Sequence, residues 1–190
     1  MNESKIMQNL QYQIRNALIE VGPGGVLLPE LATEWTGNAD STVWTFKLRE
    51  GVEFHNGQPF GAEDVVFSLN LHRGENTTSV NKSLMTEVAD IQASSPHEIT
   101  VTLSAPNSGF PAVLSMNPMV IVPVVTSDFD AGIGTGGYVP ESYEPGVKSR
   151  VTRNPNYWKE DRGHFDAVEM LATCDVNACT TAPRTERPTQ

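Results

Sequence analysis

An apolar residue recurs at every fourth position near the N-terminus of the chain. The series comprises Ile6, Leu10, Ile14 and Leu18. This spacing places the four side chains on one face of a helix, so we predict an amphipathic helix here. The glycine- and proline-rich run 22–25 should end this helix with a turn. A shorter helical turn is expected to begin at Pro29 and to continue through Leu31 to Trp35.

Strict alternation of apolar and polar residues predicts two half-buried strands further along the chain. In the segment 43–48, the apolar face carries Trp44, Phe46 and Leu48. In the segment 99–103, the apolar face carries Ile99, Val101 and Leu103. Turn signals on both sides of residues 52–54 indicate a hairpin-like excursion after the first of these strands.

Helical segments are expected between the strands. Residues 62–72 are predicted to form a helix, because Glu63 and Asp64 suit the positive end of a helix dipole and apolar residues follow them. The segment 84–88 is a weaker helical candidate, and residues 110–114 have room for one or two helical turns.

The C-terminal half contains a glycine-rich loop, 132–137, followed by a predicted hairpin. Its strands are 138–143 and 147–153, and a further strand is expected at 168–172. Helices and strands are mixed along the chain without an internal repeat and without regular alternation of strand and helix. We therefore expect an α+β (mixed α/β) fold rather than a doubly wound parallel sheet.

The charge and length of the chain bear on whether it binds nucleic acid, crosses a membrane or is secreted. The chain has 190 residues, with 13 Lys and Arg against 23 Asp and Glu, and a formal net charge of −10. Such an acidic chain is poorly suited to bind the negatively charged phosphate backbone of a nucleic acid, so no nucleic-acid partner is expected. No apolar run approaches the roughly 20 residues that cross a bilayer. The N-terminal residues lack a secretory pattern, which indicates a cytoplasmic protein or a chain whose true start is missing.

The C-terminal residues differ from the rest of the chain. Cys174 and Cys179 are close together, but with His164 they do not supply the ligands of a zinc site, so we expect unlinked thiols and no metal. The segment 179–190 is polar and contains prolines. We expect it to be a disordered or aberrant tail, since it cannot bury enough surface to offset its ordering entropy.

The glycine-rich loop contains the one sequence motif that could bind a cofactor. Gly132, Gly134 and Gly137 match the glycine spacing of a dinucleotide-binding loop. That chemistry needs a helix N-terminus after the loop, whereas the following residues include Pro140 and alternate like a strand. We therefore expect a tight backbone crossing that only glycine permits, and no cofactor. A small nucleotide-dependent enzyme that uses this loop is the alternative.

Other residue patterns do not point to catalysis. The sequence contains neither a nucleophile elbow nor a zinc-protease motif, so an enzyme is not expected. The scattered histidines are expected to be solvated surface groups; they are His55, His72, His97 and His164. Asp128 and Asp130 could bind a cation, but one carboxylate pair is far short of a calcium loop, and a solvated turn is favoured.

Four stretches together resemble one protein family. They are Leu28–Trp35, Trp44–Leu69, Ile133–Tyr138 and Arg153–Trp158. In this order and spacing they are similar to the family 5 extracellular solute-binding proteins, which are the peptide- and nickel-binding components of bacterial ABC importers. The resemblance covers residues 6–178. It implies the first lobe of a two-lobed periplasmic binding protein type II-like fold, incomplete here.

The resemblance also implies partners and a location. The solute would be a peptide or a similar small molecule. The partner would be an ABC permease and ATPase complex at the membrane, and the protein would be periplasmic or otherwise extracytoplasmic. Family members are much longer, so residues 1–178 would be an N-terminal fragment, mostly one lobe. One lobe offers a single wall of a cleft, and we expect the chain alone to bind ligand weakly or not at all. A chaperone-like interaction module is a further alternative, which would need an exposed apolar groove.

The same resemblance suggests where a ligand would touch the chain. The expected positions lie near Met7, near His72 and near Asn117 to Met119. Met7 and Met119 also suit ordinary core packing. A structural role is expected for the glycine motif, which includes Gly134, Thr135, Gly136 and Tyr138.

Overall fold

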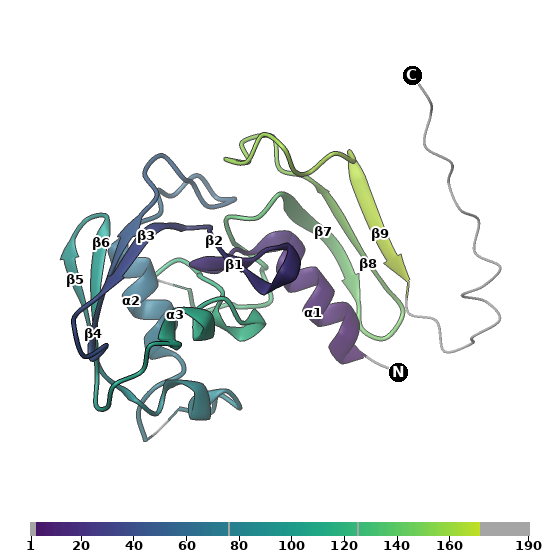
Figure 1. The fold of residues 1–190 in the computed structure, drawn as a ribbon. Helices are drawn as coiled ribbons and strands as arrows, with labels where there is room; N and C mark the ends of the chain where they lie inside the picture. Colours follow the sequence, from purple (N-terminus) through teal and green to yellow (C-terminus); the bar gives the residue numbers. More distant parts are fainter. Residues whose placement is uncertain (1–2, 76, 125, 172–190) are drawn as a thin grey trace.

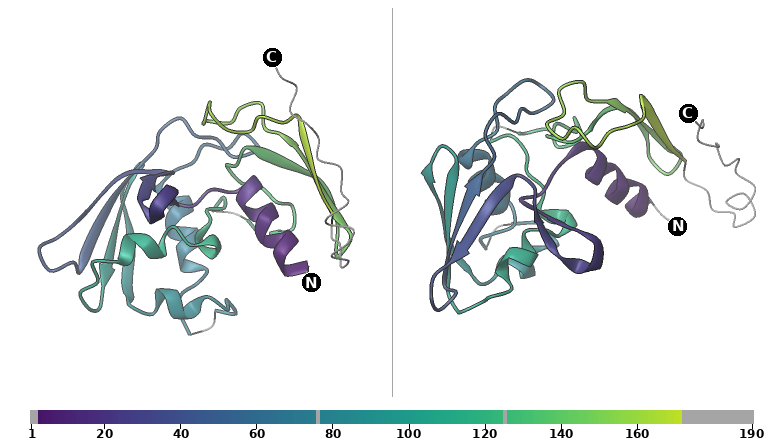
Figure 2. Two further views of the ribbon diagram at one scale, coloured as in Figure 1. Left: turned by 45° about the vertical axis from the view of Figure 1, so that its right-hand side comes forward. Right: turned by 45° about the horizontal axis from the view of Figure 1, so that its top comes forward.

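The computed structural model describes residues 3–75, 77–124 and 126–171. Two antiparallel sheets lie at opposite ends of the described molecule, and the N-terminal helix and a two-stranded hairpin lie between them (Figure 1). Two further views show the same separation of the sheets (Figure 2). The combination of helices with antiparallel sheets confirms the predicted α+β class.

The first sheet has the strand order β3–β4–β6–β5. Its strands are β3 (Ala32–Gly37), β4 (Val43–Leu48), β5 (Val88–Ser95) and β6 (Glu98–Leu103). Alternation turns Trp44, Phe46 and Leu48 toward the main core, as predicted. Two helices, α2 (Ala62–Asn70) and α3 (Phe110–Val113), add buried side chains to this core. Both helices were predicted, and α2 ends two residues before the expected His72.

The second sheet has the strand order β7–β8–β9. Its strands are β7 (Tyr138–Glu144), β8 (Lys148–Arg153) and β9 (Ala167–Leu171), which confirms the predicted hairpin and final strand. The helix α1 (Glu3–Ile14) packs on this sheet. A smaller apolar cluster fills the contact between them; its buried members are Leu10, Ile14, Tyr138 and Val151.

The N-terminal helix is shorter than its apolar periodicity predicts, because it ends at Ile14 rather than at the turn 22–25. Beyond this point the backbone carbonyl groups accept hydrogen bonds from other parts of the fold instead of from the next helical turn. The Ile14 carbonyl accepts from Gly136, and that of Asn16 accepts from Ile121. Leu18 is fully buried in the main core, so tertiary packing has overridden the helical spacing.

A hairpin replaces the turn predicted around residues 22–25. Its strands are β1 (Ile19–Val21) and β2 (Leu27–Pro29), joined by the 3₁₀ turn η1 (Pro23–Gly25). The helical turn predicted from Pro29 to Trp35 is wrong, because Pro29 pairs with Ile19 in this hairpin and Ala32 opens β3. The Ala32 amide donates to the Leu18 carbonyl at 2.8 Å, which extends the chain here.

Two other segments follow the sequence only in part. A 3₁₀ turn, η2 (Lys82–Met85), stands where residues 84–88 suggested a helix, and Val88 already belongs to β5. This strand was not predicted because it is an edge strand with mostly exposed residues, so its apolar alternation is weak. The excursion after β4 is confirmed by a bridge between Glu53 and Pro59.

Several expectations concern residues outside the described ranges. Ala172, Cys174, Cys179 and the tail 179–190 all belong to this group. Among the helices that are described, no apolar stretch is long enough to span a bilayer.

Candidate functional site

A cavity of about 460 Å³ opens beside the C-terminal end of α1. Strand β1 forms a second side, and the loop 154–166 between β8 and β9 forms a third. The polar residues that line it are Tyr12, Gln13, Arg15, Asn16, Glu20, Glu30, Ser115, Tyr138, Tyr157, Lys159 and Arg162. A concave site with convergent polar groups is the usual place to look for ligand binding.

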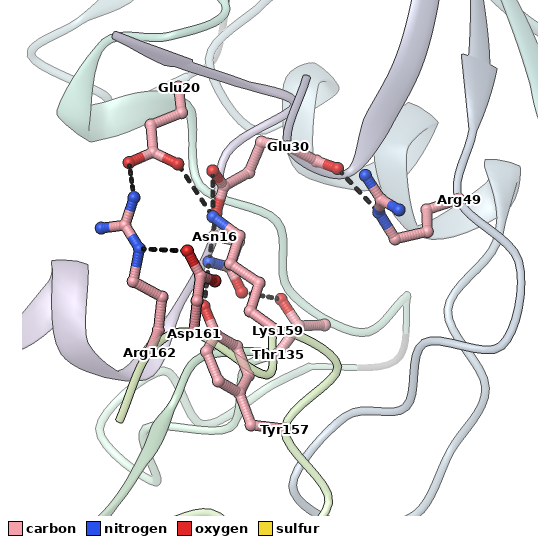
Figure 3. Close-up of polar contacts among 9 residues, drawn as sticks. All are labelled: Asn16, Glu20, Glu30, Arg49, Thr135, Tyr157, Lys159, Asp161 and Arg162. Atoms are coloured by element: carbon pink, nitrogen blue, oxygen red, sulfur yellow. Dashed lines mark hydrogen bonds and ion pairs between the residues drawn. The ribbon is translucent and has the colours of Figure 1, made fainter. Parts of the chain in front are cut away.

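Asn16 lies at the centre of the polar network that forms the cavity wall (Figure 3). Its side-chain amide donates to Glu30 Oε1 at 2.5 Å and lies 3.4 Å from the Tyr157 hydroxyl. Its carbonyl oxygen accepts from the Thr135 hydroxyl at 2.9 Å. The end of α1, the hairpin and the glycine-rich loop are therefore joined through one buried side chain.

Lys159 is the second junction of the network. Its ammonium lies 2.9 Å from Glu20 Oε2 and 2.7 Å from Glu30 Oε2, so one cation bridges both carboxylates of the hairpin (Figure 3). Arg162 adds a contact of 3.1 Å to Glu20 Oε1. These pairs connect the loop 154–166 to the β1–β2 hairpin.

The two carboxyl groups differ in their surroundings, and their pKa values move in opposite directions. Burial raises the pKa of Glu30 to about 7, and the nearby carboxyl of Glu20 adds to this effect. Burial acts in the same sense on the more exposed Glu20, but hydrogen bonds with Glu30 and Lys159 outweigh it and lower that pKa to about 2. The ammonium contacts both carboxyl groups and favours the charged form of each, so burial is the main cause of the raised pKa of the inner one.

The same region holds Trp158 between two cations. The Arg49 guanidinium lies 4.5 Å from the ring centroid, and the Lys159 ammonium lies 4.9 Å from it. Arg49 also donates from Nε to the backbone carbonyl of Glu30 at 3.1 Å. This arrangement adds cation–π attraction to the ion pairs that hold the loop.

The predicted tight crossing of the glycine-rich loop is confirmed, and the structure shows that the loop crosses the backbone at the end of α1. A Cβ atom on Gly136 would lie 2.5 Å from the Gln13 carbonyl oxygen and 2.8 Å from the Arg15 amide nitrogen. The same atom on Gly134 would overlap the Ile14 carbonyl. Only glycine permits this crossing, and the strand β7 follows the loop where a dinucleotide site would need a helix. The loop geometry therefore speaks against the nucleotide-dependent alternative.

The other residues of the glycine motif are buried parts of the wall. Thr135 is fully buried and bonded to Asn16, while the Tyr138 hydroxyl accepts from the Phe165 amide at 3.2 Å. His55 Nε2 lies 3.0 Å from the Gly136 carbonyl. His55 is half-buried, and burial lowers its pKa, so the expectation of a solvated group is wrong for this histidine.

Of the residues expected to touch a ligand, His72, Asn117 and Met119 do not line this cavity. His72 is half-buried, with Nδ1 2.6 Å from the Ser79 hydroxyl, and burial lowers its pKa despite a contact with the Pro118 backbone. The structure thus brings His72 close to the turn η3 (Asn117–Met119). Met119 is fully buried in the main core, which fits its packing alternative. Met7 belongs to α1, and its side chain lies outside the description.

Asp128 forms the solvated turn that was favoured for it. Its Oδ1 accepts from the amides of Asp130 and Ala131 at 3.0 and 3.2 Å. In the ranges that the structure describes, no three His, Cys, Asp or Glu side chains converge as metal ligands would.

The chain was compared with known families and proteins. The family described as bacterial extracellular solute-binding proteins, family 5 Middle, matches residues 26–185. The nickel-binding periplasmic protein of Escherichia coli strain K12 is 28% identical over 159 residues, which are 79% of this chain and 30% of that protein. Di/tripeptide-binding protein 2 of Pseudomonas aeruginosa is 27% identical over 87% of this chain and 36% of its own.

Solved structures share the fold. The binding protein AgaA of A. tumefaciens R10, solved with agropinic acid, superposes with a TM-score of 0.87 over 96% of this chain and 38% of its own, at 22% identity. A nickel ABC transporter protein of Bacillus halodurans superposes with a TM-score of 0.78 over 90% of this chain and 35% of its own, at 28% identity. The chain thus spans only about a third of the length of these relatives. The family match over most of its residues shows that the chain belongs to family 5 of the bacterial extracellular solute-binding proteins.

Proposed function

We propose that the chain is the N-terminal part of the substrate-binding component of an ABC importer for peptides or a similar small solute. The match of residues 26–185 to the solute-binding family carries this proposal. A partner permease and ATPase, and a periplasmic or other extracytoplasmic location, follow from the same assignment. Solute binding without chemical conversion is the proposed role.

The geometry supports a receptor wall rather than a complete receptor. Binding proteins of this kind close two lobes around a ligand, and affinity comes from surface buried on both sides. Here the polar cavity is surrounded by the end of α1, the hairpin and the loop 154–166. Lys159 and Arg162 are already paired with Glu20 and Glu30, and Arg15 donates to the backbone carbonyls of Phe129 and Ile133. The isolated chain should therefore gain little from a solute.

A chimera tests this proposal. Residues 1–171 of the chain would replace the corresponding part of the Pseudomonas di/tripeptide-binding protein, and calorimetry would measure binding of a panel of di- and tripeptides. The isolated 190-residue chain is the comparison, and circular dichroism checks that both proteins are folded. We expect binding by the chimera to be at least 100-fold tighter than binding by the chain alone.

Two results would refute the proposal. One is micromolar binding of a peptide by the isolated chain, because a single wall should not reach that affinity. The other is a folded chimera that binds no member of the panel. A matched control, in which the same junction joins the relative to its own N-terminal part, shows whether the junction itself disturbs binding.

A further inference from the structure

The loop 154–166 is held to the β1–β2 hairpin largely through charged groups. Lys159 contacts Glu20 and Glu30, and Arg162 contacts Glu20. The two carboxylates come from opposite strands of one hairpin: Glu20 lies in β1 and Glu30 directly follows β2. The structure therefore places two acidic groups of one element against a single, partly buried ammonium of another.

Glu30 is the more buried of the two carboxyl groups that share the Lys159 ammonium. Its side chain is 6% exposed, whereas that of Glu20 is 30% exposed. Asn16 contributes an amide to its carboxylate from the end of α1, and Arg49 binds its backbone carbonyl rather than its carboxylate. Tyr157, from the loop, faces the same space as a neutral hydroxyl. Among the residues that the structure describes, Lys159 alone supplies positive charge directly to the Glu30 carboxylate.

The surroundings of Glu20 leave little spare positive charge. Arg162 is 54% exposed and its Nε also lies 3.8 Å from the Asp161 carboxylate. The carboxyl groups of Glu20 and Glu30 are within hydrogen-bonding reach of one another. A proton on Glu30 would remove the repulsion between them and the cost of a buried charge, while Lys159 stays paired with Glu20.

We propose that docking of the loop 154–166 onto the hairpin takes up a proton, which the Glu20–Glu30 pair holds against Lys159. The loop closes more tightly over the cavity when the proton is bound and loosens when it is released. This proton uptake affects how tightly the loop covers the cavity, and it does not depend on which solute the whole receptor binds.

The direction of the pH dependence follows from linkage. Glu30 in the docked state has a pKa raised from 4.5 to about 7, so its contribution to docking is complete below pH 4.5 and is lost as the pH rises through about 7. Glu20 has a lowered pKa, and its contribution persists throughout this window. Docking should therefore weaken about tenfold between pH 6 and pH 8.

Hydrogen exchange measures this change directly. Amides of residues 157–163 in the full chain would be followed at pH 6 and pH 8, with correction for the intrinsic pH dependence of exchange. We expect about tenfold less protection at pH 8. In Glu30→Gln, which keeps the hydrogen-bonding shape without a titrating proton, the difference should vanish. Equal wild-type protection at both pH values, or an unchanged difference in E30Q, would overturn the proposal.

Two control variants separate other causes. Glu34→Gln removes an exposed carboxylate on β3 that pairs with Lys47 on β4, and it should leave the difference intact, because Glu34 is far along the chain from the loop. His164 lies exposed on the same loop, so His164→Gln must also leave the difference intact. Loss of the pH difference in either control would contradict the assignment to Glu30.

If E30Q does not fold, the proposal can still be tested on the wild-type chain. Carbon NMR of the Glu30 carboxyl group gives its titration midpoint without any substitution. A midpoint above 5.5 supports the proposal, and a midpoint at or below 5.5 overturns it. In Glu20→Gln the midpoint should move downward, because the neighbouring negative charge is gone.

Discussion

Gly136→Ala tests whether the crossing of the glycine-rich loop and α1 holds the two parts of the fold together. The added Cβ would lie 2.5 Å from the Gln13 carbonyl oxygen and 2.8 Å from the Arg15 amide nitrogen, both of them backbone atoms. Ordinary contacts need about 3.5 Å, so the helix and the loop must separate by about 1 Å. This movement breaks or stretches the 3.1 Å hydrogen bond from the Gly136 amide to the Ile14 carbonyl.

The expected cost can be assembled from these contacts. Overpacking costs about 1–3 kcal/mol, and a lost hydrogen bond adds about 1 kcal/mol. Alanine recovers about 0.5–1 kcal/mol because it restricts the unfolded chain. We therefore expect the free energy of unfolding to fall by about 1–4 kcal/mol, measured by urea denaturation with circular dichroism.

The matched control is Gly109→Ala before α3. The nearest atom to its added Cβ is Asn107 Oδ1 at 3.4 Å, which belongs to a partly exposed side chain rather than to the backbone. This variant should stay within about 0.5 kcal/mol of the wild type. If Gly136→Ala proves as stable as Gly109→Ala, the backbone contact does not constrain the loop and the reasoning is refuted.

Three further substitutions test the core and the loop contacts. Phe46→Ala should lower the free energy of unfolding by about 3–5 kcal/mol, since the ring is fully buried; a loss below about 1 kcal/mol in urea would contradict this core assignment. Ser68→Ala should cost about 1–3 kcal/mol by the same assay, because Ser68 Oγ accepts from the Val122 amide at 2.9 Å and no water can replace it in a buried site; an unchanged midpoint would contradict this. Arg49→Ala should shift the fluorescence of Trp158 and cost about 1 kcal/mol, as the guanidinium no longer covers the ring; an unchanged spectrum would exclude the stacking.

Local periodicity was sufficient to predict the elements whose secondary structure is set by their own sequence. In β4 and β6 the alternation of apolar residues matches the buried face, and in α2 the acidic first turn matches a helix start. The glycine spacing at Gly134 and Gly136 also predicted the crossing correctly, because no other residue fits there. These patterns involve residues that are close together in the sequence, so the predictions made from them hold in the folded structure.

The same reasoning failed where distant residues decide the backbone path. Leu18 continues the helical spacing of α1, but its carbonyl accepts from the Ala32 amide at 2.8 Å. Pro29 suits a helix start, yet it pairs with Ile19 in a hairpin. In both cases a partner at least ten residues away supplies the hydrogen bond or the packing that the local pattern assigned to a helix.

The polar network could not be found in the sequence, since its members are far apart and ordinary by themselves. Lys159 stands 139 positions from Glu20 and 129 from Glu30, in a turn that reads as solvated. Glu30 sits in an apolar run, and its burial becomes costly only once the loop covers it. The chain therefore contains a charge cluster whose strength depends on the docking of one loop.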